Sequence, residues 1–408
     1  MQNTLPLLAS LALVIAAAKL AGFVANRLGQ PAVMGELLVG LLLGPSLLNL
    51  FDLPYFHDAH ALDTVRELGE IGVIFLMFAA GLEIHIDDFL KAGRPAVFSG
   101  TLGVIVPILL GAAAALPFGY DLAHSFFIGI VLSATSVSIS AQTLMELGRL
   151  RSREGLTLLG AAVVDDVLAI AALSAFVALI ANTGTGGAGG LIWIIARMLI
   201  FLVAAFFVGQ WLLPRLAAWA DRLPVSEGAT TAVIVMALIF AWASEVMGGV
   251  AAITGAFIAG AALGRSHLRK QIAESIHTLA YSFFVPIFLV SIGLAADLRE
   301  LSSADLGLAV VICLIAVVSK LLGSGLGAKL GGMTWPEAWR VGAGMVSRGE
   351  VGLIVAGVGI STGFIENNVF AVVLVMVLFT TLIAPVLLRF AFQEKVLRNA
   401  ATRRADHS

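Results

Sequence analysis

Long apolar runs separated by short polar connections dominate this chain of 408 residues. A helix needs about 20 apolar residues to cross the hydrocarbon core of a bilayer, and thirteen segments come close to or exceed this length. They cover residues 4–25, 31–50, 66–84, 95–116, 123–146, 154–181, 191–219, 227–247, 249–264, 274–296, 304–330, 335–363 and 367–392. Segment 9 is short, and segments 6, 7, 11 and 12 are long, so we expect tilted or interrupted helices. The pattern predicts an all-α integral membrane protein with 13 transmembrane helices.

The basic residues are divided unequally between the two sets of alternating connections. Eighteen of the 24 lysines and arginines fall in one set, and only Arg66 and Arg299 fall in the other. The remaining four lie within the spans: Lys19, Arg197, Lys320 and Arg348. Because cytoplasmic loops carry the excess of Lys and Arg, we expect the N-terminus outside and the C-terminus in the cytoplasm.

Composition supports the membrane assignment. Hydrophobic residues make up 60% of the chain and charged residues only 12%, whereas soluble domains carry about 25% charged residues. The formal net charge of −2 gives no indication of a nucleic-acid partner. Cys313 is the single cysteine, which excludes a disulfide framework within the chain and a cysteine metal site.

Two pairs of segments share a glycine pattern. Segments 2 and 9 have glycines at the same spacing, namely Gly35, Gly40 and Gly44 in one and Gly255, Gly260 and Gly264 in the other. Gly81 of segment 3 and Gly293 of segment 10 lie in similar apolar stretches. The offset of seven helices means that the copies cross in opposite directions. This favours two inverted-topology repeats, helices 1–6 and 8–13 with helix 7 as linker, as in secondary transporters. The alternative is that glycines recur in any packed membrane helix.

Two adjacent carboxylates, Asp165 and Asp166, lie inside the apolar segment 6. A charge near the bilayer centre costs at least about 2.5–3.5 kcal/mol, so intramembrane carboxylates are candidates for ion or proton sites. Lys320, in the middle of segment 11, is the available counter-charge. Adjacent helical residues point about 100° apart, so we expect one carboxylate to pair with Lys320 and the other to face a water-filled cavity. A structural salt bridge alone is the alternative, and it would explain only one of the two.

Segments 5 and 12, which correspond in the two repeats, both contain unusual polar stretches. Residues 133–140 include five hydroxyl side chains, and residues 342–352 include four glycines together with Arg348 and Glu350. Matching interruptions in the two halves are the best sequence indication of a transporter site. We therefore expect two crossed, broken helices, with Arg348 and Glu350 neutralising the opposing half-helix dipoles. Ordinary hydrogen bonding between helices is the alternative for the hydroxyls.

Several stretches together resemble the monovalent cation:proton antiporter superfamily, in its second branch, and most closely its NapA-type bacterial Na⁺/H⁺ antiporters. They are PAVMGELLVGLLLGPSLL, FLMFAAGLEI, SATSVSISAQTLMELG, GAAVVDDVLAI, SKLLGSGLGAKLGG and GMVSRGEVGLIVA, which extend over nearly the whole chain. The resemblance implies that Asp166 binds the cation and that Asp165 pairs with Lys320. It also implies that Thr135 and Ser136 lie close to the ion, so that Na⁺ would be held at Asp166, Asp165 and Thr135.

The resemblance further implies a homodimeric, multi-pass protein of the bacterial inner membrane with an elevator mechanism. A core ion-translocation domain (95–182 and 301–393) would move against a dimerisation domain (1–94 and 223–300). Residues 183–222 would link them, and 394–408 would form a cytoplasmic tail. The protein would not be an enzyme and would need no cofactor besides its cargo. An Asp-Asp pair with a lysine is the electrogenic pattern of the family, exchanging two protons for one Na⁺ or Li⁺, whereas Asn-Asp members are typically electroneutral.

Two alternatives remain at this stage. One is a K⁺/H⁺ antiporter or K⁺ efflux protein of the same superfamily. Gated efflux members carry a nucleotide-binding domain after helix 13, whereas about 15 residues follow that helix in this sequence, so we expect no gated efflux, while K⁺ stays open as a substrate. The other is a cation channel, although channels usually build a filter from rings of carbonyls or charges, and no such segment is evident.

Overall fold

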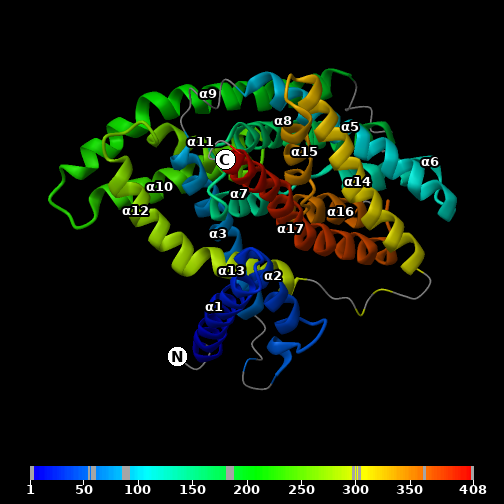
Figure 1. The fold of residues 1–408 in the computed structure, drawn as a ribbon, viewed down its shortest axis with the longest axis horizontal. Coiled ribbons are helices and arrows are strands. Elements are labelled where there is room, and N and C mark those ends of the chain that lie inside the picture. The colour runs from blue at the N-terminus through cyan, green and yellow to red at the C-terminus, as the bar shows by residue number, and fades with distance from the viewer. Residues whose placement is uncertain are drawn as a thin grey trace.

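The computed structural model describes residues 4–53, 56, 61–84, 92–180, 188–295, 299, 301, 305–361 and 364–405, and this part of the chain contains helices and no strand (Figure 1). The first half comprises α1 (Thr4–Arg27), α2 (Ala32–Leu43), η1 (Leu50–Asp52), α3 (Ala61–Glu83), α5 (Gly93–Ala115), η2 (Leu116–Phe118), α6 (Leu122–Ser133), α7 (Val137–Glu146), α8 (Arg153–Ile180) and α9 (Ala188–Asp221). The second half comprises α10 (Gly228–Ala243), η3 (Ser244–Gly248), α11 (Ala252–Leu263), α12 (Arg269–Leu279), η4 (Ala280–Phe284), α13 (Val285–Leu294), α14 (Leu306–Leu330), α15 (Trp335–Gly344), α16 (Glu350–Ser361) and α17 (Asn367–Ala405).

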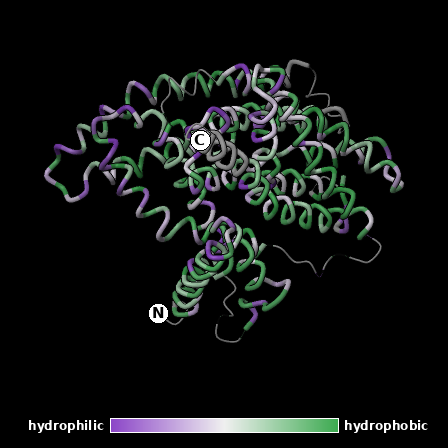
Figure 2. The backbone as a smooth tube through the Cα atoms, in the orientation of Figure 1, coloured by the Kyte–Doolittle hydropathy of each residue, from purple (hydrophilic) through white to green (hydrophobic). Residues whose placement is uncertain are grey.

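The helices are apolar along most of their length. Within the described residues, nine helical stretches are long and apolar enough to cross a membrane, and α2, α11 and the 351–360 part of α16 are apolar but shorter. Hydrophobic positions dominate the tube in Figure 2, and hydrophilic positions gather at connections such as the one between α9 and α10. The protein is therefore a multi-pass membrane protein.

The helices pack as two groups. The core group consists of α5–α8 and α14–α17, with α5 packed along α14, α6 and α8. The panel group consists of α1–α3 and α10–α13, in which α3 packs on α11 and α2 on α13. Helix α9 contacts α8 of the core group and α10 and α11 of the panel group, and it runs along one edge of the molecule (Figure 1). The two groups meet where α2 and α3 approach α7, and where α2 approaches α17.

Local sequence explains several helix ends. The predicted span 31–50 is helical only from Ala32 to Leu43, because Gly44 and Pro45 end the helix. Helix α6 begins at an Asp121 N-cap, whose side chain accepts a hydrogen bond from the His124 amide at 2.8 Å. Helix α15 begins with a capping box between Thr334 and Glu337.

Two close helix crossings in the panel group require glycine. A Cβ on Gly40 of α2 would lie 2.2 Å from the Val290 carbonyl oxygen of α13. A Cβ on Gly260 of α11 would lie 2.1 Å from the Phe78 carbonyl oxygen of α3. Small residues allow membrane helices to approach to backbone contact, and here the two crossings use glycines at matching positions of segments 2 and 9.

Candidate ion-binding site

Two helices of the core group are interrupted, and the interruptions meet. Residues 134–136 separate α6 from α7, and residues 345–349 separate α15 from α16. The Ser136 amide donates to the Ser347 carbonyl at 2.9 Å, and the Ser347 hydroxyl donates to the Ser136 carbonyl at 2.6 Å. The Ser140 hydroxyl donates to the Gly344 carbonyl at 2.5 Å. Backbone groups exposed by a break are costly in lipid, and these reciprocal bonds satisfy several of them.

Arg348 hydrogen-bonds to a backbone carbonyl at the C-terminal end of α6. Its guanidinium is fully buried, and its Nε and Nη2 donate to the Leu132 carbonyl in the last turn of α6 at 3.2 and 2.8 Å. A third guanidinium nitrogen, Nη1, donates to the Val346 carbonyl. A cation at a helix C-terminus opposes the negative end of the dipole, so Arg348 compensates α6. The side chain of Glu350 lies outside the described part of the structure.

Asp165 and Lys320 form a buried ion pair next to these breaks. Lys320 Nζ of α14 lies 2.6 Å from Asp165 Oδ1 of α8, and the two side chains are 0% and 1% exposed. Gly103 of α5 lies beside the pair: a Cβ there would be in ordinary contact with both charged atoms at 3.7 Å, but it would clash with the Ser324 hydroxyl at 2.4 Å. Lys320 therefore pairs with Asp165, the first of the two adjacent carboxylates.

Asp165 also lies beside Thr135. Asp165 Oδ2 and the Thr135 hydroxyl are both buried, and neither has a hydrogen bond of acceptable geometry among the described residues. Thr135 lies in the break between α6 and α7, where its own backbone carbonyl is not committed to a continuous helix. Carboxylate, hydroxyl and carbonyl oxygens are the ligands that hard cations prefer. The described residues contain no cluster of three His, Cys, Asp or Glu side chains of the kind that holds a metal ion.

Asp166 points toward the panel group. It is 6% exposed, and its Oδ2 accepts a hydrogen bond from Thr254 of α11 at 3.2 Å. The predicted water-filled cavity is wrong for this conformation, because the cavity beside Asp166 measures only about 10 Å³. A volume of this size holds about one water molecule.

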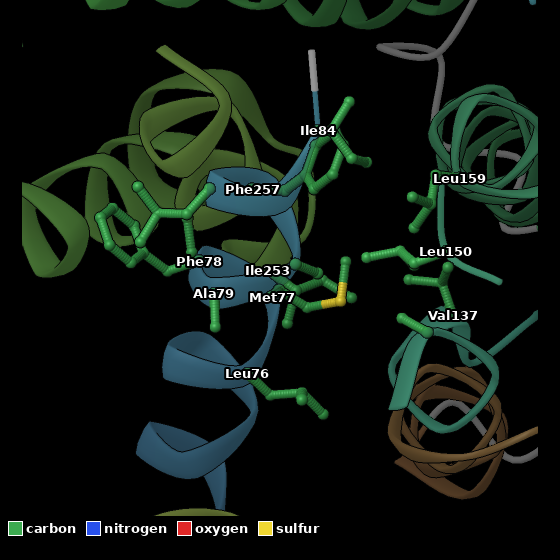
Figure 3. Packing of buried hydrophobic residues seen from close by; sticks show 14 of the residues in the cluster. Leu76, Met77, Phe78, Ala79, Ile84, Val137, Leu150, Leu159, Ile253 and Phe257 are labelled. Atoms are coloured by element: carbon green, nitrogen blue, oxygen red, sulfur yellow. The ribbon is translucent and has the colours of Figure 1, made fainter. Parts of the chain in front are cut away.

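The cavity is small because apolar side chains close it from both groups. Met77, Ile253 and Phe257 come from the panel group, and Val137, Leu159, Ala162 and Val163 come from the core group. Figure 3 shows Met77 and Ile253 on one side, directed toward Val137 and Leu159 on the other. This apolar seal is continuous with a large buried hydrophobic cluster that spans both groups.

Comparison with known proteins identifies the family of the chain. The family model for the transmembrane sodium/hydrogen exchanger matches residues 12–394. The chain belongs to the sodium/hydrogen exchanger family. Among similar proteins, the Na⁺/H⁺-K⁺ antiporter GerN of Bacillus cereus is 36% identical over 94% of this chain and 96% of its own length. A Na⁺/H⁺ antiporter of Enterococcus hirae is 34% identical over 95% of this chain and 98% of its own length. The solved structure of the sodium proton antiporter MjNhaP1 from Methanocaldococcus jannaschii is similar in fold, with a TM-score of 0.67 at 18% identity over 94% of this chain and 96% of that one.

The exchanger fold also brings together residues that the sequence did not single out. Arg340 of α15 donates from Nη1 to Glu154 Oε1 of α8 at 2.9 Å and from Nε to the Ala391 carbonyl of α17 at 2.9 Å, all within the buried interior. Glu154 and Arg340 both lie near the ends of predicted segments, where charges are usually solvated. Only their burial in the structure distinguishes them from ordinary surface charges.

A polar cavity of about 390 Å³ lies between the two groups. Its lining includes Glu36, Glu83 and Glu146, together with Lys19, whose Nζ lies 3.6 Å from Glu36 Oε1. Glu146 of α7 also accepts a hydrogen bond from the Ala32 amide at 3.0 Å, and it thereby caps the start of α2, a helix that has no side-chain cap of its own. The cap therefore joins the core group to the panel group.

Proposed function

We propose that this protein is a secondary active antiporter that exchanges protons for Na⁺ across the membrane. The observation that carries the proposal is the buried ion pair of Asp165 and Lys320 beside Asp166, at the crossing of two interrupted helices, in a chain of the sodium/hydrogen exchanger family. Its relatives are transporters by name. Intramembrane carboxylates of this kind serve ion and proton transfer.

In this proposal Asp166 binds the proton and the cation in turn, and the neighbouring Asp165 is held by its ion pair with Lys320. A carboxylate binds either a proton or a cation at the same oxygens, so the two cargoes compete for Asp166. Thr135 and Ser136 would contribute oxygens next to Asp165, which fits the unpartnered atoms Asp165 Oδ2 and Thr135 Oγ1. Na⁺ is cargo in this scheme, and no resident cofactor is needed.

An elevator motion fits the packing. The core group would slide with its bound ion against the panel group, with α9 as linker, across thirteen spans with the N-terminus outside and the C-terminus in the cytoplasm. The matched glycine crossings of Gly40 and Gly260 support two inverted repeats, because each repeat supplies the same contact to the other. By this proposal the panel group also forms the homodimer contact, and the protein resides in a bacterial inner membrane.

Exchange of two protons for one Na⁺ follows if the ion pair opens during the cycle. Na⁺ would then displace one proton from Asp166, and the second proton would leave from Asp165 or Lys320 when the pair rearranges. Each elementary charge moved through 100 mV is worth about 2.3 kcal/mol, so the rate should respond to membrane potential.

Proteoliposomes test the proposal directly. Adding Na⁺ should collapse a preformed pH gradient, Asp166→Asn should abolish this response, and an imposed potential should alter its rate. Na⁺ flux without proton movement would instead indicate a channel. Absence of any potential dependence would contradict the 2:1 exchange while leaving antiport intact.

K⁺ is the second candidate cargo. GerN of Bacillus cereus carries both Na⁺ and K⁺ in its name, and carboxylate and hydroxyl oxygens suit either ion. The same assay run with Na⁺, Li⁺ and K⁺ across a range of pH would rank the three by apparent affinity.

A further inference from the structure

The hydrogen bond from Thr254 to Asp166 crosses the interface between the two helix groups. Thr254 is the third residue of α11, which packs on α3 and α10 in the panel group. Asp166 is on α8, which packs on α5 and α15 in the core group. Both side chains are buried, at 4% and 6% exposed. Relative motion of the groups must therefore break this bond.

Thr254 and the first turn of α11 lie beside Asp166 in this conformation. The Thr254 hydroxyl donates to Oδ2 at 3.2 Å, and the first turn of a helix carries partial positive charge that stabilises a nearby anion. Hydrogen bonds to an ionised acceptor are about twice as strong as neutral ones. A proton or a bound cation on Asp166 removes that charge and weakens the bond.

We propose that Thr254 is a positioning residue that restrains the core group while Asp166 carries neither a proton nor a cation. This inference rests on the proposed antiport and assigns Thr254 a part in coupling. An exchanger stays coupled only if its unloaded, ionised form does not cross the membrane. If that form crossed freely, protonated Asp166 would move one way and empty Asp166 the other, and protons would leak without Na⁺.

Removal of the Thr254 hydroxyl should produce a leak of protons that does not require Na⁺. Thr254→Val has a similar shape but lacks the hydroxyl, so the unloaded core group loses the hydrogen bond between Asp166 and the panel group. A hydrogen bond to a charged group corresponds to a change of about tenfold to a hundredfold in an equilibrium. Sodium-independent proton flux should rise by that order in Thr254→Val, and fewer protons should be exchanged per Na⁺. Thr254→Ser, which keeps the donor, should restore both values.

The assay follows internal pH in proteoliposomes under an imposed pH gradient, in a buffer free of Na⁺ and K⁺, with thiocyanate as the permeant anion. Thr157→Val is the matched control, because Thr157 is a fully buried threonine of α8 whose hydroxyl has no partner among the described residues. It should leak no more than the wild type. Thermal unfolding of each purified variant confirms that it is folded.

The double variant Asp166→Asn/Thr254→Val separates coupling from structural damage. In this proposal the leaking proton is cargo carried on Asp166, so this variant should not leak, and a persistent leak would overturn the proposal. Thr254→Val with wild-type leak, or with altered apparent Na⁺ affinity alone, would overturn it as well. Failure of the proposed antiport has a different signature, namely Na⁺ flux without proton movement in the wild-type protein.

Discussion

Removal of one partner from the ion pair of Asp165 and Lys320 should destabilise the protein strongly. At 2.6 Å and an effective dielectric constant of about 20, the attraction is roughly 6 kcal/mol. The desolvation of two buried charges, several kcal/mol per ion, offsets most of it. Asp165→Asn keeps the shape but leaves Lys320 buried without its ionic partner. Such a loss costs about 3–5 kcal/mol.

That energy translates into a measurable shift in melting temperature. The unfolding entropy is about 2.1 cal/mol/K per residue, or roughly 0.9 kcal/mol/K for a chain of 408 residues. Dividing the loss of stability by this entropy gives a fall in melting temperature of about 4–6 °C. Membrane helices that remain helical on unfolding gain less entropy, which makes this shift a lower bound. The measurement is thermal unfolding of the detergent-solubilised protein, monitored as the fraction that still elutes as folded protein in size-exclusion chromatography after heating.

Two further variants make the test specific. Asp165→Asn/Lys320→Gln contains no buried charge at this position, so its midpoint should recover to within about 2 °C of the wild type. Asp63→Asn is the surface control, since its ion pair with Arg66 is exposed and 4.0 Å long, and it should shift the midpoint by about 1 °C or less. Additive losses in the double variant, or an unchanged midpoint in Asp165→Asn, would refute the reasoning.

Three other predictions concern the scaffold around the site. Arg348→Met should cost about 3 kcal/mol or more, because several charged hydrogen bonds to buried carbonyls are lost, and Arg348→Lys should recover part of it in the same unfolding assay. Glu146→Ala should cost about 1 kcal/mol as a lost helix cap, with faster hydrogen exchange confined to the first turn of α2; unchanged exchange there would mean that the cap contributes nothing. Gly40→Ala and Gly260→Ala should each reduce the yield of folded protein, since a Cβ would meet a backbone oxygen at 2.2 and 2.1 Å. Gly357→Ala, with nothing within 4 Å of an added Cβ, should be neutral or slightly stabilising.

The sequence predicts most of what depends on local pattern. Apolar runs mark the helices, and the hydroxyl and glycine clusters mark the two breaks, because polar or flexible residues are unfavourable inside a membrane helix. Lys320 stands out for the same reason, since a mid-span charge needs a partner.

Features that depend on packing between distant helices are not visible in the sequence. Thr254 is an ordinary helical threonine until α11 is placed beside α8. Glu154 and Arg340 resemble loop charges until both are buried. The closed cavity at Asp166 reflects how the two groups sit in one conformation, and no residue pattern encodes a conformation by itself.

The ion pair also has a consequence for the biosynthesis of the protein. Asp165 and Lys320 are 155 residues apart in the chain. At 5–20 residues per second, the ribosome needs about 8–31 s to make the lysine after the aspartate. During that interval α8 carries two carboxylates into the membrane without their counter-charge. We therefore expect integration of α8 to be completed late, together with α14, and chains truncated before Lys320 should leave α8 poorly inserted.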